Sequence, residues 1–269
     1  MDLSNSEIDS RNLVVTILAA GEGKRMKSNV PKVLCLFKNK PILIGIIQQV
    51  VLLKPRKIII VTGKHSKMIE KYCLEYLKNY ENSLLEFVIQ NDPKGTGHAI
   101  CSTLHQYSND DKVLILNGDM PNITHTILDR FLCQIYLNNF ENTIISINVD
   151  KPDGYGRIIL NDNKIVNIIE EKEANQEEKK INLINTGIYC FDSTCLNFIV
   201  PQIENNNVQG EYYLTDIVKL CQKNNIYIHN ITLMDQYINN VLGVNTKEEL
   251  DKLEFNTNNK TTSSSASAM

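Results

Sequence analysis

The chain has 269 residues, of which 42% are hydrophobic and 22% are charged, a composition typical of a globular protein with one or two domains. Its net charge of −3 provides no basic field of the kind that binds nucleic acid. The seven cysteines are scattered singly, so we expect free thiols. The polar amino terminus is no signal peptide, and no apolar run approaches the ~20 residues of a membrane helix. We therefore expect a cytoplasmic location and no membrane contact.

Apolar, β-branched runs alternate with amphipathic stretches along the first half of the chain, and this alternation predicts a mainly parallel, doubly wound α/β sheet. In the second half the expected strands follow one another more closely, which predicts a mixed or antiparallel extension. The predicted strands are Leu13–Leu18, Lys57–Val61, Glu86–Ile89, Lys112–Leu116, Thr143–Val149, Arg157–Leu160, Lys164–Ile169, Gly187–Phe191 and Ile226–Ile231. The predicted helices are Ile42–Leu53, Lys67–Lys78, Gly97–Tyr107, Thr126–Leu137, Cys195–Ile203, Thr215–Lys223 and Lys247–Leu253.

The chain shows no internal repeat and no linker, so we expect one domain over residues 12–254. Residues 1–11 lack periodicity and residues 255–269 are of low complexity, and both segments are predicted to be disordered tails. Thr246 precedes the last predicted helix and Glu249 follows three residues later, a spacing that predicts a capping box.

A glycine-containing loop with four cations follows the first predicted strand in the stretch VTILAAGEGKRMKSNVPKVL. The spacing fits neither a P-loop nor the GxGxxG dinucleotide motif, because Met26 stands where the third glycine would be. Small residues directly after a buried strand indicate close approach of the backbone to a flat ligand. The cations Lys24, Arg25, Lys27 and Lys32 indicate an anionic ligand, the alternative being an ordinary solvated turn.

Polar groups also follow the third and fourth predicted strands of this parallel region. Gln90 can offer both a donor and an acceptor to a nucleobase, and Thr96 could cap the next helix. The plainer alternative is a simple helix start in which His98 is a packed histidine. Asp119 follows Gly118 at a strand end, where a single carboxylate is a common Mg²⁺ anchor, unless it only begins the turn before Pro121.

The second half combines amides, hydroxyls, glycines and carboxylates between its predicted strands, which is the equipment of a sugar pocket. Its candidates are Gly156, Glu170, Asn185, Tyr213 and Thr215. Glu171 and Glu173 are expected to be solvated. Asn245, just before the last helix, is by itself best explained as part of a turn.

Taken together, these stretches resemble the sugar-nucleotide pyrophosphorylases, whose nucleotide loop has the form LAAGxGxRMxSxxPK. The segments GTGHA, GYGRI, INTGIY, QGEYYLTD and GVN narrow the resemblance to the uridyltransferase domain of the bacterial bifunctional enzyme that makes UDP-N-acetylglucosamine. The resemblance extends from about Val14 to Leu250 and implies a Rossmann-like, GT-A-like nucleotidyltransferase fold. It also implies Mg²⁺-dependent transfer of UMP from UTP to N-acetylglucosamine 1-phosphate with release of pyrophosphate.

The resemblance also implies roles for individual residues. The uridine would be held by Leu18, Ala19, Ala20 and Gly21, with Gln90, Gly95 and Thr96 contacting the uracil, and Gly118 would also be a substrate-binding residue. Arg25 and Lys32 would contact the triphosphate, and Asp119 and Asn245 would hold Mg²⁺. The N-acetylglucosamine site would be formed by Gly156, Glu170, Asn185, Tyr213 and Thr215. Because the nucleophile is a phosphate oxygen that is already anionic, no general base is expected.

The chain departs from the family pattern at three positions near the expected site. Asn117 stands where an aromatic residue is usual, Lys24 replaces a small hydroxyl residue, and Asn122 replaces leucine. None of these changes removes a predicted catalytic group. The hexapeptide-repeat acetyltransferase domain of the family is not found after Leu253, so we expect a separate acetyltransferase to supply the substrate. The alternatives are another sugar-1-phosphate nucleotidyltransferase and a non-catalytic nucleotide-sugar sensor.

Overall fold

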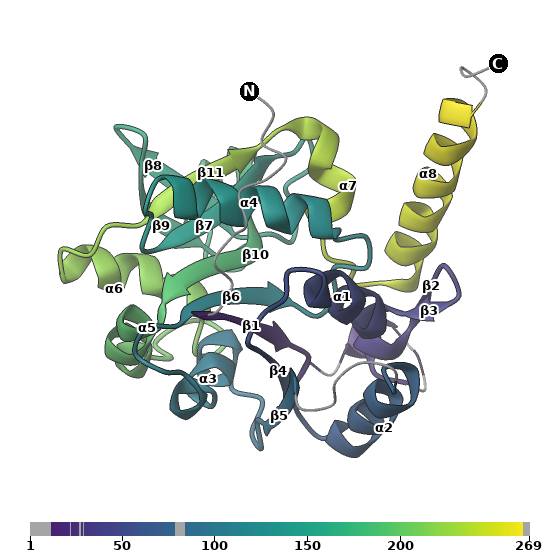
Figure 1. The fold of residues 1–269 in the computed structure, drawn as a ribbon. Helices are drawn as coiled ribbons and strands as arrows, with labels where there is room; N and C mark the ends of the chain where they lie inside the picture. The colour runs from purple at the N-terminus through teal and green to yellow at the C-terminus, as the bar shows by residue number, and fades with distance from the viewer. Residues whose placement is uncertain (1–11, 22, 27, 29, 79–83, 266–269) are drawn as a thin grey trace.

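A computed structural model of the chain describes residues 12–21, 23–26, 28, 30–78 and 84–265, with only the backbone of Lys24 and of residues 258–265. A nine-stranded mixed sheet lies at its centre and carries helices on both faces (Figure 1). The strand order is β11-β7-β10-β6-β1-β4-β5, and the strands β8 and β9 form a hairpin attached to β10. The large strands are β1 (Leu13–Leu18), β4 (Lys57–Thr62), β5 (Leu85–Ile89), β6 (Lys112–Asn117), β7 (Thr143–Asn148), β8 (Arg157–Asn161), β9 (Lys164–Ile169), β10 (Leu183–Asp192) and β11 (His229–Leu233).

Eight α-helices are assigned within the described residues, and a short separate hairpin precedes the first of them. The hairpin joins β2 (Leu36–Phe37) to β3 (Lys40–Pro41). The helices are α1 (Ile42–Val51), α2 (Ser66–Tyr76), α3 (Thr96–Cys101), α4 (His125–Leu137), α5 (Ser193–Ile199), α6 (Ile217–Lys223), α7 (Ile238–Val241) and α8 (Lys247–Ser265).

The sheet has a parallel part and a mixed part, as the spacing of the strands predicts. β1 pairs in parallel with β4 and β6, and β4 pairs in parallel with β5. β10 then runs antiparallel between β6 and β7. The mixed, mainly parallel sheet is therefore confirmed. As a consequence, β1, β4, β5 and β6 all end at the same edge of the sheet.

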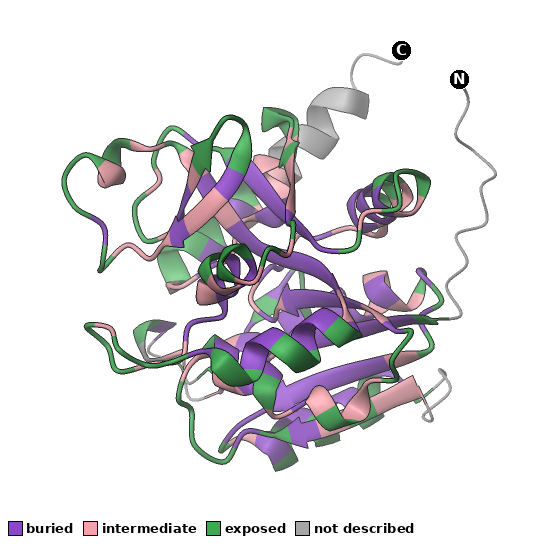
Figure 2. Ribbon diagram, turned by 90° about the vertical axis from the view of Figure 1, so that its left-hand side faces the viewer, coloured by how far each residue is buried: buried purple, intermediate pink, exposed green. Residues whose placement is uncertain are grey.

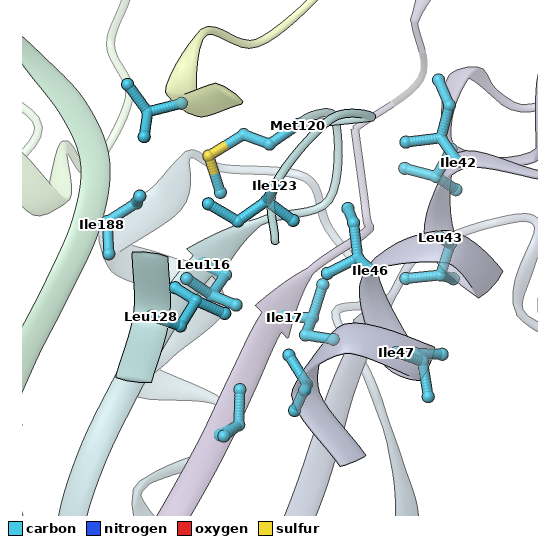
Figure 3. Packing of buried hydrophobic residues seen from close by; sticks show 14 of the residues in the cluster. Ile17, Ile42, Leu43, Ile46, Ile47, Leu116, Met120, Ile123, Leu128 and Ile188 are labelled. Atoms are coloured by element: carbon cyan, nitrogen blue, oxygen red, sulfur yellow. The ribbon is translucent and has the colours of Figure 1, made fainter. Parts of the chain in front are cut away.

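Side chains of the central strands alternate between two buried faces, because successive residues of a strand point to opposite sides. Val15 and Ile17 of β1 enter the larger core cluster, whereas Val14 enters a smaller cluster on the other face. Figure 3 shows Ile46 of α1 lying beside Ile17, and Leu128 of α4 packs in the same cluster. The resulting layer of buried strands between half-exposed helices is visible in Figure 2. Burial of each such side chain contributes about 1.5–3 kcal/mol, so the strand ends rest on a rigid base.

Several element boundaries differ from the predicted ones. The predicted helix over Gly97–Tyr107 is divided into α3 and a 3₁₀ turn at Leu104–Gln106, and the predicted helix over Cys195–Ile203 ends as α-helix at Ile199. Pro201 explains the second change, because it lacks the amide hydrogen that an α-helix requires there. β11 lies at His229–Leu233 and not at Ile226–Ile231.

Helix α8 continues to Ser265, past the predicted end at Leu253, and takes in residues 255–265 of the segment predicted to be disordered. Its sequence contains no glycine or proline that would stop it. Residues 1–11 and 266–269, the remainder of the predicted tails, lie outside the described residues. Among the helices that the structure describes, none has the length and apolarity required to cross a bilayer.

Candidate active site at the carboxyl edge of the sheet

The loops that leave the parallel strands are tied together by backbone hydrogen bonds just beyond the strand ends. The amide of Gly118 donates to the carbonyl of Leu18 at 2.9 Å, and the amide of Ala19 donates to Val61 at 2.8 Å. The amide of Gln90 donates to the carbonyl of Thr62 at 2.7 Å. The backbone of the site is therefore an extension of the sheet, and its position follows from the strand order.

A cavity of about 670 Å³ opens at this edge, a volume within the range of sites for small ligands. Eleven residues predicted for the nucleotide and metal sites line it: Leu18, Ala20, Gly21, Arg25, Lys32, Gln90, Gly95, Thr96, Gly118, Asp119 and Asn245. Ala19 was predicted with them but is buried, with 2% of its surface exposed, and is not a lining residue. Alternation along the chain turns Ala19 into the core, whereas its neighbours Leu18 and Ala20 face the cavity.

Two glycines allow the cavity walls to approach closely. A Cβ at Gly118 would lie 2.7 Å from the carbonyl oxygen of Leu18, which is too close for any side chain. Gly95 has a φ of +109°, and a Cβ there would lie 2.5 Å from the carbonyl oxygen of Tyr212. Gly95 therefore requires glycine for both backbone geometry and space, and Gly118 requires it for space.

Two cations and two oxygen ligands converge at one end of the cavity. Lys32, in the 3₁₀ turn Lys32–Leu34, forms an ion pair with Asp119 and lies 3.4 Å from Oδ1 of Asn245. Arg25 donates from Nη2 to the same Asn245 oxygen at 2.9 Å. The side chains of Lys32 and Asp119 are only 13% and 20% exposed, so their attraction is less screened than at an open surface. The side chain of Lys24 and all of Lys27 lie outside the described residues.

Asn245 is held at this point by the start of helix α8. The backbone amide of Glu249 donates to Oγ1 of Thr246 at 3.1 Å, which confirms half of the predicted capping box. The Glu249 carboxylate accepts the amide of Asn245 at 2.6 Å, one residue before the expected cap position. The cap thus fixes the backbone of Asn245 and not only the helix end.

The donor set of Asp119 and Asn245 suits a hard divalent cation. One carboxylate and one amide oxygen face the same positive charge, the Lys32 ammonium, although they come from distant parts of the chain. Mg²⁺ prefers oxygen ligands and commonly takes few of them from the protein when a phosphate supplies others. No cluster of three or more His, Cys, Asp or Glu ligands occurs in the described part of the chain.

Gln90, another residue of the cavity wall, lies against the first residues of helix α3. It is 3% exposed, and its Nε2 donates to the carbonyl of Gly95 at 3.0 Å and contacts Nδ1 of His98 at 2.8 Å. Thr96 does not cap the helix as expected. Its Oγ1 instead accepts the amide of Leu214 at 3.0 Å, because Thr96 is already the first helical residue.

The five residues predicted for the sugar site lie near one another but do not line the cavity. The hydroxyl of Thr215 donates to Oε1 of Glu170 at 2.9 Å. The backbone amide of Asn185 donates to the backbone carbonyl of Gly156 at 2.9 Å. Tyr213 accepts a hydrogen bond from Gln209 at 2.6 Å. Each of the polar side chains in this set already has a protein partner in the structure.

Burial raises the pKa of Glu170 above its usual value of 4.5. The hydrogen bond from Thr215 acts in the opposite direction, and neighbouring carboxylates, Asp216 first among them, reinforce the effect of burial. Burial also raises the pKa of the nearby Tyr189. The hydroxyl of Tyr189 accepts a hydrogen bond from the side-chain amide of Asn185 at 2.6 Å. Tyr189 thus joins the cluster, although the sequence pattern places it only as a core residue of a strand.

The structure adds cavity residues that the motif analysis missed. Gln209 and Glu211 line the cavity from the segment before Tyr213, and Gln209 also contacts Lys172. They belong to the QGEYYLTD segment, whose glycine and adjacent polar residues were a signal that this loop faces a ligand. Gln209 therefore links the cavity to the cluster around Glu170, because it bonds to Tyr213.

Glu171 is not simply solvated as expected. Its carboxylate pairs with Arg157 at 2.7 Å, and this arginine side chain is 1% exposed. A buried guanidinium requires such a partner because an unpaired charge in the interior is costly. The pair lies directly beside Gly156 and Glu170 in sequence and so helps to fix both.

Asn117, the position at which an aromatic residue is usual, also lines the cavity. Its Nδ2 lies where a Cβ of Gly187 would be, at only 2.0 Å. Gly187 has a φ of +77° and sits at the bulge of β10 between Asn185 and Tyr189. The carboxamide of Asn117 therefore occupies space that the glycine leaves open.

Comparison with known proteins identifies related sequences along nearly the whole chain. A family model described as nucleotidyl transferase matches residues 14–235. A probable UDP-N-acetylglucosamine pyrophosphorylase of Acanthamoeba polyphaga mimivirus is 41% identical over 251 residues, which are 91% of this chain and 96% of that protein. The bifunctional protein GlmU of Francisella philomiragia is 37% identical over 90% of this chain. The chain spans about half of that bifunctional protein, since the alignment covers 51% of it.

Solved structures with the same fold are more distant in sequence. A UDP-glucose pyrophosphorylase complexed with UDP-glucose superposes with a TM-score of 0.73 over 92% of this chain and 98% of that one, at 20% identity. A putative glucose-1-phosphate thymidylyltransferase from Bacillus anthracis gives a TM-score of 0.69 over 90% and 94%, also at 20% identity. At this level of identity the likeness establishes the α/β fold and nothing finer.

Proposed function

Since the chain belongs to the nucleotidyl transferase family, we propose that it is a UDP-N-acetylglucosamine pyrophosphorylase that transfers UMP from UTP to N-acetylglucosamine 1-phosphate. The observation that carries the proposal is the convergence of Lys32, Arg25, Asp119 and Asn245 at one end of a cavity of nucleotide size. The similarity to the mimivirus protein over nearly its full length supports the choice of uridine and N-acetylglucosamine.

The reaction requires alignment and charge neutralisation more than proton transfer. The attacking group is a phosphate oxygen that is already ionised, so no general base is needed. Lys32 and Arg25, which meet at Asn245, would stabilise the negative charge of the α-phosphate and of the departing pyrophosphate. In the structure Lys32 is paired with the Asp119 carboxylate and Arg25 with the neutral amide oxygen of Asn245, so phosphate binding would replace these partners with phosphate oxygens.

Asp119 and Asn245 are proposed to hold Mg²⁺, which would neutralise phosphate charge when bound. The fit rests on the two oxygens that face one positive charge in the structure. Lys32 would then leave its ion pair with Asp119 and turn toward the triphosphate. The same two oxygens can face either cation, because the carboxylate is partly exposed to the cavity.

The remaining predicted residues are assigned to the two ends of the substrate. Leu18, Ala20 and Gly21 would pack against the uridine, with Gln90, Gly95, Thr96 and Gly118 around it. Ala19 would support this loop from beneath, because it is buried. Gly156, Glu170, Asn185, Tyr213 and Thr215 are proposed to bind the sugar and its acetyl group.

The proposal is tested by supplying the purified chain with Mg²⁺, each of four nucleoside triphosphates and several sugar 1-phosphates, and measuring pyrophosphate release. UTP with N-acetylglucosamine 1-phosphate should give the highest kcat/KM, with TTP as the next best nucleotide because one added methyl group has a small steric cost. A higher kcat/KM with another pair would assign the chain to a different member of the family. Binding without product in a single-turnover experiment would instead indicate a nucleotide-sugar sensor.

A further inference from the structure

We propose that His98 is a positioning residue for base selection. It holds the side-chain amide of Gln90 in one orientation, in which only the side-chain oxygen of Gln90 is free to contact a ligand. The inference rests on the proposed function, in which Gln90 meets the base of a nucleotide. It identifies a residue outside the cavity lining that controls which edge of a base the cavity accepts.

The orientation of the Gln90 amide follows from its contact with the backbone. One polar end of the amide lies 3.0 Å from the carbonyl oxygen of Gly95. A carbonyl oxygen can only accept a hydrogen bond, so the atom that faces it must be the NH₂ group. The reversed amide would bring two oxygens together in a site where Gln90 is 3% exposed and water cannot easily separate them.

His98 occupies the second hydrogen of the same NH₂ group. Its Nδ1 lies 2.8 Å from Nε2 of Gln90. An amide NH₂ group is a donor and not an acceptor, so Nδ1 must accept, and the imidazole proton lies on Nε2. Both hydrogens of the amide are therefore directed at protein atoms, and the acceptor Oε1 is the group left for the cavity that Gln90 lines.

The first turn of helix α3 keeps His98 in place. The amide of Gly97 donates to the carbonyl of Tyr212 at 2.7 Å, and a Cβ at Gly97 would lie 3.0 Å from that oxygen. The ring of Tyr212 lies 6.1 Å from the His98 ring, centre to centre. The histidine is thus held between the two halves of the chain.

An acceptor-only amide selects a base edge that offers a ring N–H. The imide edge of uracil has a donor at N3 between two carbonyl groups, whereas N3 of cytosine is an acceptor. An oxygen placed opposite N3 therefore pairs with uracil and repels cytosine. Without His98, a flipped amide would lose one hydrogen bond and not two, so the penalty against cytosine would fall.

The test compares kcat/KM for UTP and CTP in four variants. His98→Ala and His98→Leu both remove the acceptor, and leucine also preserves much of the side-chain volume. His98→Asn places an amide oxygen at the same bond distance from the helix as Nδ1 and should rescue the acceptor. The matched control is His105→Ala, because His105 also contacts a glutamine, Gln106 at 2.9 Å, but lies at the exposed surface away from the cavity.

We expect His98→Ala and His98→Leu to lower the UTP-to-CTP ratio by about 5- to 10-fold, the loss that corresponds to one hydrogen bond. The ratio should return toward the wild-type value in His98→Asn and stay unchanged in His105→Ala. Calorimetric affinities for UMP and CMP should change in the same direction, which gives a readout independent of turnover.

The inference is overturned if the ratio is unchanged in both His98→Ala and His98→Leu, or if His98→Asn behaves like them. A variant that only loses stability would lower both rates and leave the ratio intact, so a packing role alone also contradicts the inference. A wild-type chain that transfers no nucleotide, or that does not prefer UTP, would contradict the proposed function itself.

Discussion

The parallel part of the sheet and its antiparallel extension present their polar groups in different ways. Beyond β1, β5 and β6, the predicted nucleotide and metal residues face an open cavity. Beside β8, β9 and β10, the polar side chains of the predicted sugar residues are hydrogen-bonded to other protein groups, and Thr215 is only 4% exposed. Parallel strands that end together place their following residues at one edge, whereas the extension positions its groups through side-chain hydrogen bonds.

This difference predicts different consequences of mutation. Charged groups around the cavity are proposed to stabilise the charge that builds up on the phosphates during the reaction, so their removal should mainly lower kcat. In the extension the polar side chains of the predicted sugar set, Glu170, Asn185, Tyr213 and Thr215, each have a protein partner. Removal of one of them leaves its partner unsatisfied and should affect substrate choice and stability. Four experiments test this difference between the two parts of the sheet.

The largest effect is expected for Asp119→Ala. This change removes the only anion among the two proposed metal ligands and leaves Lys32 without its carboxylate partner. We expect kcat to fall by at least about 100-fold, with a higher Mg²⁺ requirement, and Asn245→Ala to have a smaller effect because a neutral amide is the weaker ligand. Turnover measured across a Mg²⁺ titration checks this, and a near-wild-type rate at ordinary Mg²⁺ would refute the metal assignment.

Lys32→Ala should lower kcat more than it raises KM for either substrate. The lysine is proposed to stabilise charge that grows as pyrophosphate leaves, so its effect belongs to the transition state. We expect a loss on the order of 10- to 100-fold in kcat. Steady-state kinetics with both substrates varied provides the measurement. An increase in KM for UTP alone would make Lys32 a ground-state binding residue.

In the extension, Thr215→Val should raise KM for N-acetylglucosamine 1-phosphate by about 5- to 10-fold and leave KM for UTP unchanged, because Glu170 loses one hydrogen bond. Wild-type protein should also use glucosamine 1-phosphate poorly, since the proposed acetyl contacts are lost. Thr232→Val is a matched control, because it removes the same hydroxyl group outside the proposed sugar cluster. Thr232 lies in β11, and its hydroxyl contacts that of Ser146 in β7 at 3.0 Å. Equal turnover of the two sugar phosphates would contradict the sugar-site assignment.

The smallest effect concerns two adjacent glutamates whose pKa values shift in opposite directions. Burial raises the pKa of Glu170, so its contribution to stability is greatest below its usual pKa of 4.5 and is lost as the pH rises through the raised value. For Glu171 partial burial acts upward, but hydrogen bonds from Arg157 and Gly154 and the nearby positive charges lower the pKa. Its contribution is therefore present above 4.5 and is lost as the pH falls through the lowered value.

Free energies of unfolding in urea, measured from about pH 3 to about pH 8, should separate the two glutamates. Glu170→Gln should remove the fall in stability that the wild type shows as the pH rises above 4.5. Glu171→Gln should remove the fall in stability that the wild type shows as the pH drops below 4.5. Profiles parallel to the wild type in both variants would show that neither carboxylate is coupled to folding as described.

Most of the parallel half of the sheet could be predicted from the sequence. β1 has the predicted bounds, because an uninterrupted apolar run between polar segments has one favourable arrangement in a buried strand. Once β1, β4, β5 and β6 are parallel, residues that follow them must meet at one edge, so Gln90 and Asp119 could be predicted as neighbours of the glycine loop. The family motifs added the chemical roles that strand order cannot supply.

The hydrogen-bond partners of the side chains, in contrast, could not be predicted from the sequence. That Asn245 meets Arg25, that Thr96 accepts from Leu214, and that Gln209 reaches the cavity all depend on contacts between segments far apart in the chain. Local sequence cannot specify such contacts, because hydrogen-bond partners are selected by the positions of both elements at once. For the same reason the orientation of the Gln90 amide became apparent only when Gly95 and His98 were seen beside it.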